Sequence, residues 1–120
     1  MAKWQIDAML DAALDYISGN ATQLFVCSGQ PADYVGIAAV ALTGGATPSF
    51  QANQDGDAGG RKLAVDEEAD ILVTATDDAT HVALASADTL LYVTTCTLQT
   101  LTSGNTVTVP TWDIEIDDAA

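Results

Sequence analysis

The sequence offers few side chains that could do chemistry, and the histidine is the first to consider. His81 is the single histidine of the chain and stands inside an alternating run, between Thr80 and Val82. Enzymes that use a histidine base place it near a serine or cysteine nucleophile, and zinc peptidases carry it in an HExxH helix. Neither a GxSxG nor an HExxH pattern occurs in this sequence. We therefore expect His81 to be structural rather than catalytic.

Acidic residues cluster in two places that could attract a cation. The run from Asn53 to Asp57 has oxygen ligands at alternate positions, as an EF-hand loop does. However, Ala58 stands where that loop needs glycine, and Ala64 stands where it needs a closing glutamate. In the second cluster, residues 66–70, adjacent carboxylates would point to opposite sides of a strand. Both clusters are typical of solvated turns, so we expect neither a metal nor another cofactor.

The cysteines and the glycine pairs do not form a recognisable site either. Cys27 and Cys96 lie far apart in apolar contexts without a CxxC pattern, so they are either buried thiols or a disulfide between neighbouring strands. The pairs at 44–45 and 59–60 are not followed by the lysine and hydroxyl residue of a phosphate loop. A carboxylate pair for glycoside hydrolysis remains open in so acidic a chain, although only 6% of the residues are aromatic. An enzyme is not expected.

Charge limits the partners that the chain can bind. There are 17 acidic residues against three basic ones, and the formal net charge is −14. A field of this sign repels phosphate backbones and anionic membranes. No apolar stretch approaches the roughly 18 residues of a membrane span, and the first residues lack the apolar run of a signal peptide. We therefore expect a protein made inside the cell that binds neither nucleic acid nor membrane, with an acidity that either favours solubility or suits a basic protein surface.

The first element that must support any site is an amphipathic helix, predicted over residues 5–18 and expected to be the only helix. Its apolar residues recur at spacings of three and four, with Met9, Leu10 and Leu14 among them. Three aspartates recur every four residues beside this face: Asp7, Asp11 and Asp15. Such a row is either a solvated face or a surface that binds a partner.

The middle of the chain is less regular. Residues 22–28 predict a strand, residues 31–34 a turn, and residues 35–42 permit either a short helix or an irregular strand. Residues 43–60 lack a periodic apolar pattern altogether. A loop of this length within a compact domain is usually functional or mobile, so we expect it to be an arm that contacts a partner.

The C-terminal part, residues 61–116, is expected to be β-structure. A strand over residues 61–65 precedes four successive strands between residues 69 and 116, with turns at 66–68 and 77–78. Two alternating runs, residues 80–85 and 90–97, are joined by a polar connection of hairpin length.

The last predicted strand changes phase at a proline. Its apolar residues stand at odd positions through Val109 and at even positions from Trp112 onward, with Pro110 between them. A slip of one residue turns every later side chain to the other face of a sheet. We therefore expect a bend at Pro110 and Thr111, with a strand that crosses from one sheet to another.

Together these elements predict one domain over residues 1–120. Its fold class is mainly β: an antiparallel β-sandwich, jelly-roll-like or Ig-like, with one N-terminal amphipathic helix packed against it.

Three segments carry a resemblance to a known family. The first comprises residues 10–17, 20–22 and 26–28, the second comprises 55–57 and 60–62, and the third runs from the 79–84 strand to residues 101–109. In this order they resemble a family of small virion proteins of tailed bacteriophages, encoded among head and connector genes. The chain departs from the family in its heavier acidity and in the acidic turn at 66–68.

The resemblance implies a structural role without catalysis. The expected function is a capsid decoration (cement) protein on the outside of the virion, assembled in the host cytoplasm and bound to the major capsid protein or another virion protein, commonly as a homo-oligomer. The alternatives are a head-to-tail connector or a tail adaptor for fibre attachment, and, outside the virion, a carbohydrate-binding β-sandwich that uses Trp112 or Tyr34. The predicted contact residues are Asp7, Asp11, Asp15, Phe50, Asp55, Asp57, Arg61 and Lys62.

Overall fold

The computed structural model describes residues 7–56 and 60–116, and this part of the chain is mainly β-strand. Its elements, in chain order, are α1 (Asp7–Asn20), β1 (Gln23–Cys27), α2 (Tyr34–Val40), β2 (Gln54–Asp55), β3 (Arg61–Val65), β4 (Glu68–Leu72), β5 (Asp77–Ala85), β6 (Leu90–Leu101), β7 (Thr106–Val109) and β8 (Trp112–Ile116). All the paired strands are antiparallel. The prediction of a mainly β chain with antiparallel sheets and an N-terminal helix is confirmed.

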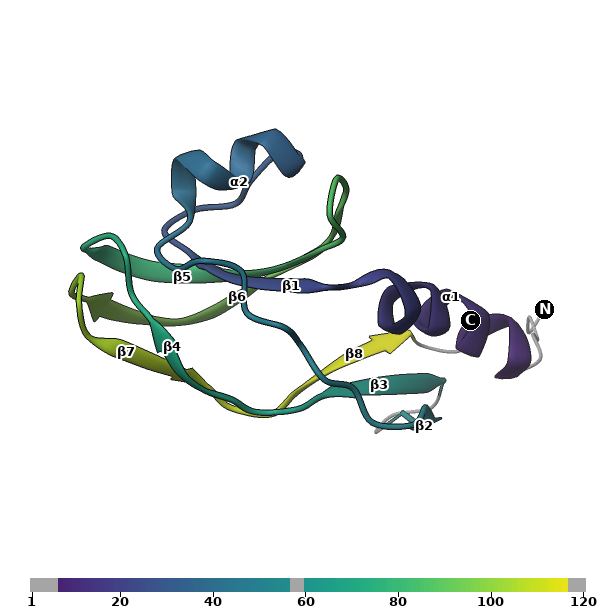
Figure 1. Ribbon diagram of the computed structural model, residues 1–120. Helices are drawn as coiled ribbons and strands as arrows, with labels where there is room; N and C mark the ends of the chain where they lie inside the picture. Colours follow the sequence, from purple (N-terminus) through teal and green to yellow (C-terminus); the bar gives the residue numbers. More distant parts are fainter. Residues whose placement is uncertain (1–6, 57–59, 117–120) are drawn as a thin grey trace.

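The strands lie in two layers that face each other across the core (Figure 1). The upper layer is the sheet β1-β5-β6, and the lower layer comprises the sheets β4-β7 and β2-β3-β8. Leu24 and Leu84 of the upper layer belong to one buried cluster with Leu63, Val107 and Ile114 of the lower layer. Burying large aliphatic side chains of this kind is worth roughly 1.5–3 kcal/mol each, so the contact between the layers dominates the stability.

The bend predicted at Pro110 is present and joins the two sheets of the lower layer. Val109, at the end of β7, pairs with Glu68 in β4, whereas Trp112, at the start of β8, pairs with Val65 in β3. Val107, Val109 and Ile114 are all buried. The phase change in the sequence therefore keeps both halves of this segment facing the same core.

The hairpin predicted in the C-terminal half is also present, with β5 and β6 as its arms. The N–H of Ser86 donates to the carbonyl of Thr89 at 2.8 Å and closes the connection. The turn predicted at residues 77–78 is wrong, because both aspartates pair with the end of β6. The hydroxyl of Thr100 donates to Asp78 across the two strands at 2.7 Å, which helps to hold this acidic pair in a strand.

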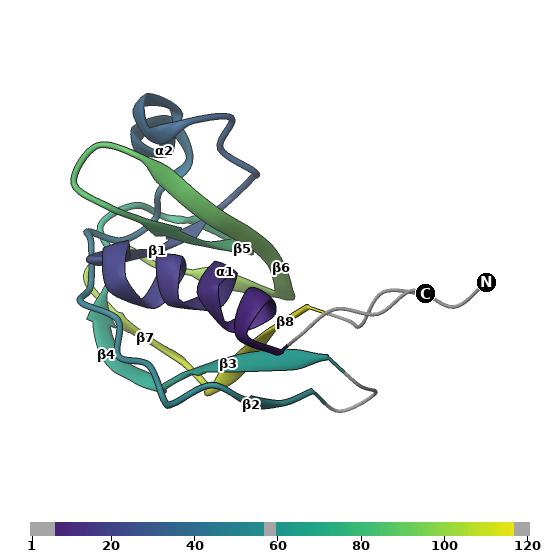
Figure 2. The ribbon, with the colours of Figure 1, turned by 90° about the vertical axis from the view of Figure 1, so that its right-hand side faces the viewer.

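Helix α1 lies at one end of the molecule beside β3 (Figure 2). It begins at Asp7 and ends at Asn20, whereas residues 5 and 6 of the predicted helix lie outside the described part. Leu10 and Leu14 are buried, but Met9 is 62% exposed. The predicted apolar face is therefore too wide, because the helix has the core on one side only and leaves Met9 facing solvent.

The prediction of a single helix is wrong, because α2 forms a second, short helix above the upper layer (Figure 1). Asp33 is its N-cap, and its carboxylate accepts a hydrogen bond from the N–H of Gly36 at 2.7 Å. Ile37 is the buried residue that anchors the helix.

The described part of residues 43–60, the stretch predicted to be an arm that contacts a partner, pairs with other parts of the chain on both sides. Ala46 bridges Leu24 in β1, and Thr43 bridges Val73 after β4, so this segment joins the two layers along one side. The buried hydroxyl of Thr43 accepts a hydrogen bond from the N–H of Val26 at 3.2 Å. Backbone hydrogen bonds therefore hold this segment in place, although its sequence has no periodic apolar pattern.

Two substitutions on α1 test its buried face. We expect Leu14→Ala to lower the free energy of unfolding by about 2–5 kcal/mol, because Leu14 is fully buried and its removal leaves a cavity. The matched control Met9→Ala should change it by less than about 0.5 kcal/mol, because Met9 is exposed. Urea unfolding followed by circular dichroism measures both, and equal losses would show that the helix packs by another face.

Candidate interaction surface

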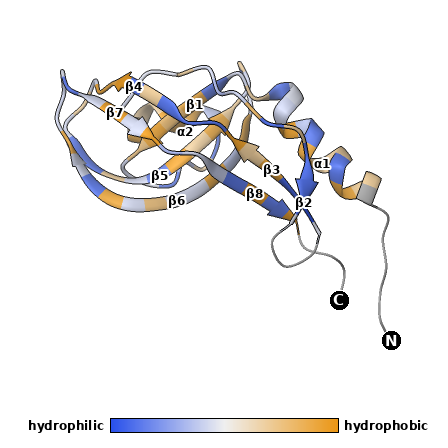
Figure 3. Cartoon of the chain, turned by 90° about the horizontal axis from the view of Figure 1, so that it is seen from below, coloured by the Kyte–Doolittle hydropathy of each residue, from blue (hydrophilic) through white to orange (hydrophobic). Residues whose placement is uncertain are grey.

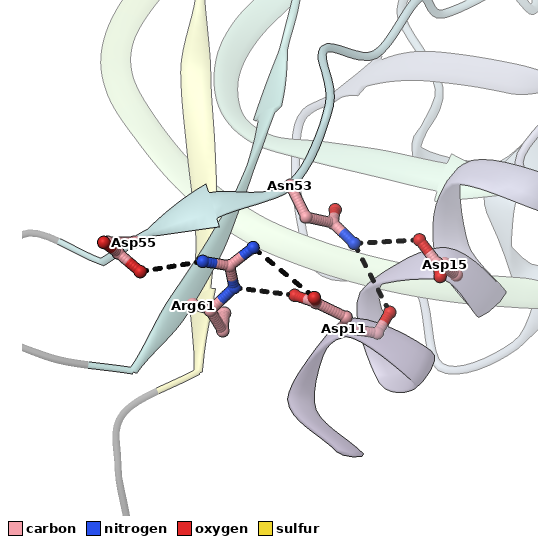
Figure 4. A network of polar contacts seen from close by, with 5 residues as sticks. All are labelled: Asp11, Asp15, Asn53, Asp55 and Arg61. Atoms are coloured by element: carbon pink, nitrogen blue, oxygen red, sulfur yellow. Dashed lines mark hydrogen bonds and ion pairs between the residues drawn. The ribbon is translucent and has the colours of Figure 1, made fainter. Parts of the chain in front are cut away.

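Arg61 joins its own strand to the nearby strand β2 and to helix α1, which is distant in the sequence (Figure 4). Its Nε and Nη2 donate to the two carboxylate oxygens of Asp11 at 2.8 and 3.4 Å, and its Nη1 donates to Asp55 at 2.7 Å. Asp11 belongs to α1 and Asp55 to β2, while Arg61 opens β3. A forked guanidinium suits such paired carboxylate contacts, so Arg61 fixes helix α1 against the lower layer.

Asn53 adds a second link between the loop and the helix. Its side-chain amide donates to the carboxylate of Asp15 at 2.8 Å and to the main-chain carbonyl of Asp11 at 3.5 Å. Two of the three aspartates predicted as a row on the helix therefore contact residues of their own chain. We call the five residues Asp11, Asp15, Asn53, Asp55 and Arg61 the Arg61 network.

The Arg61 network is acidic overall, because it contains three carboxylates and one guanidinium. The hydrogen bonding of Arg61 to the carboxylate of Asp11, with smaller contributions from Asp55, raises the pKa of Arg61 above its ordinary value. The neighbouring Lys62 lies 3.6 Å from the carboxylate of Asp113. Two of the three basic residues of the chain thus lie beside carboxylates. The remaining acidic side chains at this end of the molecule therefore make its electrostatic potential negative.

The remaining predicted contact residues are distributed differently. Phe50 is half-buried, packs against the core and bridges Val65, so it belongs to the interior rather than to an exposed arm. Asp7 begins α1, although its side chain is not described, and Asp57 lies outside the described residues. The sequence marks Asn53 only as a candidate cation ligand, and no signal in it predicts the contact with Asp15, 38 positions away in α1.

Within the described part of the chain, the histidine has a hydrogen-bond partner next to it in the sequence. The hydroxyl of Thr80 and Nδ1 of His81 are 2.8 Å apart, and both side chains are half-buried. Among residues 7–56 and 60–116, no group of three or more His, Cys, Asp or Glu side chains could hold a metal ion. No helix within these ranges is long and apolar enough to cross a membrane.

Both cysteines are free thiols. Cys27 is fully buried and Cys96 is half-buried. Burial, with a smaller contribution from Cys96, raises the pKa of Cys27 to about 11, and burial also raises the pKa of Cys96. Both groups therefore stay protonated at neutral pH, and a protonated thiol is a poor nucleophile.

Trp112, the aromatic residue considered for sugar binding, is packed between the layers. Its ring stacks on Tyr92 with centroids 6.0 Å apart and an interplanar angle of 25°. Its Nε1 is buried and has no hydrogen-bond partner in the described part of the chain. One face of the indole is therefore already covered by Tyr92, which a sugar ring would have to displace.

A hollow of about 470 Å³ lies beneath α2 and contains Tyr34. Its walls also include Phe25, Ile37, Thr43 and Thr74, without a charged side chain among its lining residues. The phenol of Tyr34 lies 3.5 Å from the side-chain oxygen of Gln23. These groups could hold a small apolar group but supply no acid, base or nucleophile.

Comparisons with known proteins found no match: no family model matches the sequence, and no curated protein or solved structure matches the chain.

Double-mutant cycles test which carboxylate contact of Arg61 contributes more to the stability of the fold. The side chain of Asp11 is 28% exposed and that of Asp55 is 88% exposed, so water screens the Asp55 contact much more. We expect a larger coupling free energy for Arg61→Gln with Asp11→Asn than for Arg61→Gln with Asp55→Asn. Urea unfolding of the single and double variants gives both values, and a larger coupling with Asp55 would contradict the assigned role of Asp11.

Proposed function

We propose that this chain is a non-enzymatic structural protein of a tailed-bacteriophage virion, and specifically a decoration protein that binds the outside of the capsid. The main support is the resemblance of three segments to small virion proteins of such phages. Two of these segments contribute Asp11, Asp55 and Arg61 to one network of contacts, the first through residues 10–17 and the second through residues 55–57 and 60–62. The residues that carry the resemblance thus include those that hold helix α1 in place, which is what a shared fold would require.

In fold terms, we assign the two facing layers to the β-sandwich class. The upper sheet and the two lower sheets enclose one core, and the segment β7–β8 turns a corner between two sheets, as strands of sandwiches do. A rigid module of this kind can present a fixed surface to a lattice of shell subunits.

Electrostatics suggests how the chain would dock. The formal net charge is −14, and Arg61 and Lys62 both lie beside carboxylates. Exposed acidic side chains occur both in connections and on strands, among them Glu67, Asp88 and Glu115. A basic patch on the major capsid protein would be attracted to such a surface, and the attraction would weaken with salt.

Copy number in the particle tests this proposal. Quantitative mass spectrometry of purified particles, scaled to the major shell protein, should find hundreds of copies, because a decoration protein follows the symmetry of the shell. About a dozen copies or fewer would instead favour the head-to-tail connector or the tail adaptor, because each particle has one connector and one tail, each built from a small ring of subunits.

A salt series on the same particles provides the control. Decoration through acidic contacts predicts release of this chain at high salt while the shell remains intact, whereas a connector would stay in place until the tail detaches. Absence of the chain from purified particles would rule out all the virion functions, and glycan binding by calorimetry would then be the next measurement.

A further inference from the structure

The longest strand of the protein has an open edge. β6 runs from Leu90 to Leu101 and ends the order β1-β5-β6, so only one of its edges is paired by the described residues. It lies along an outer side of the molecule (Figure 3). An edge strand exposes a row of unpaired N–H and C=O groups that can pair with another chain. Proteins that remain monomeric protect such edges with charge, proline, short length or covering segments.

The other edges of the two layers carry these protections. The outer edge of β1 bonds to the segment around Ala46, with the N–H of Leu24 donating to the Ala46 carbonyl at 2.7 Å. β2 is only two residues long and includes Asp55. β8 carries Asp113 and Glu115.

The sheet β4-β7 is protected as well. β4 carries Glu68 and Asp70, and its ladder is interrupted beside Asp70, whose φ of 55° is unusual for a residue other than glycine. β7 is four residues long and is followed by Pro110. β6 therefore stands apart as a long edge strand without a charged residue or a proline, although its own pairing with β5 shifts register between Thr95 and Gln99.

β6 also has an unusual composition for this chain. No charged residue and no proline occurs between Leu90 and Leu101, although the whole chain carries 17 acidic residues. Threonines recur along the strand, and facing threonines are favourable neighbours across an antiparallel pair. Leu98, in the most exposed part of the strand, is 62% exposed.

We propose that β6 pairs with β6 of a second copy of this chain, antiparallel and around a two-fold axis near Leu98, so that the upper sheets of two copies become continuous. A two-fold axis places the same strand opposite itself in antiparallel orientation, which is the geometry of a closed dimer. Leu98 of one copy would then lie beside the partner's Leu98 on one face of the shared sheet.

Charge favours a second copy over a different partner on this edge. A basic protein would be attracted to the carboxylates of the chain, and β6 contains none. Two copies with a net charge of −14 each repel one another at most approaches, and an uncharged strand is where they can meet with the least repulsion. Two shifts in the register between β5 and β6 shorten the regular run, so we expect a dimer that dissociates on dilution.

Sedimentation velocity over a concentration series tests the dimer. The wild-type chain should sediment at twice its 12.4 kDa mass at high concentration and become monomeric on dilution. Leu98→Asp should weaken association at least tenfold, because two carboxylates would face each other across the axis. The matched control Leu72→Asp changes another exposed leucine, on β4, and should leave association unchanged. Circular dichroism should show that both variants keep the wild-type fold.

Amide hydrogen exchange locates the contact. Backbone amides between Leu90 and Leu101 should gain protection as the concentration rises through the transition, while those of β4 and β8 should not. A wild-type chain that stays monomeric at roughly 200 µM, a Leu98→Asp variant that associates like wild type, or protection gained elsewhere would each overturn the proposal. These outcomes do not depend on the capsid proposal, because they concern the purified chain alone.

Discussion

The bend at Pro110 is the constraint on which the arrangement of the lower layer depends. One continuous segment supplies β7 to the sheet with β4 and β8 to the sheet with β3. Because side chains alternate along a strand, this segment can keep Val109 and Ile114 in one core only by changing phase between them. Proline has no backbone N–H. The strand ladder is therefore interrupted at a residue that could not have donated a hydrogen bond to it.

Strand periodicity made much of the β-structure predictable. The hairpin of β5 and β6 and the bend at Pro110 follow from alternation that is visible in the sequence. The predictions were less accurate where backbone contacts replace side-chain pattern. Thr43 and Ala46 pair through their main chains with Val73 and Leu24, and Asp78 pairs with Thr100 of β6, whose hydroxyl donates to it. The sequence permits helix α2 without specifying it, because its signal is one N-cap, Asp33, ahead of an alanine-rich run.

The predicted contact residues show a similar limit of sequence reasoning. Charge and spacing singled out Asp11, Asp15, Asp55 and Arg61, and the fold brings all four together. Their exposure and partners could not be predicted, because the contacts span up to 50 positions of sequence. Asp11 and Arg61 act first as a structural link between helix and sheet. Asp55, which is 88% exposed, remains the member of the network most open to a partner.

The two proposals use different parts of this architecture. The acidic surface suits a basic partner, whereas the uncharged edge of β6 suits a second copy, and the two-layered core holds both in fixed positions. All of this requires that one segment serve two sheets. Nuclear Overhauser contacts between backbone protons measure this pairing directly. They should connect Val107 with Ile71 and Ile114 with Leu63. An uninterrupted ladder in which residues 106–116 pair with a single neighbouring strand would contradict the account.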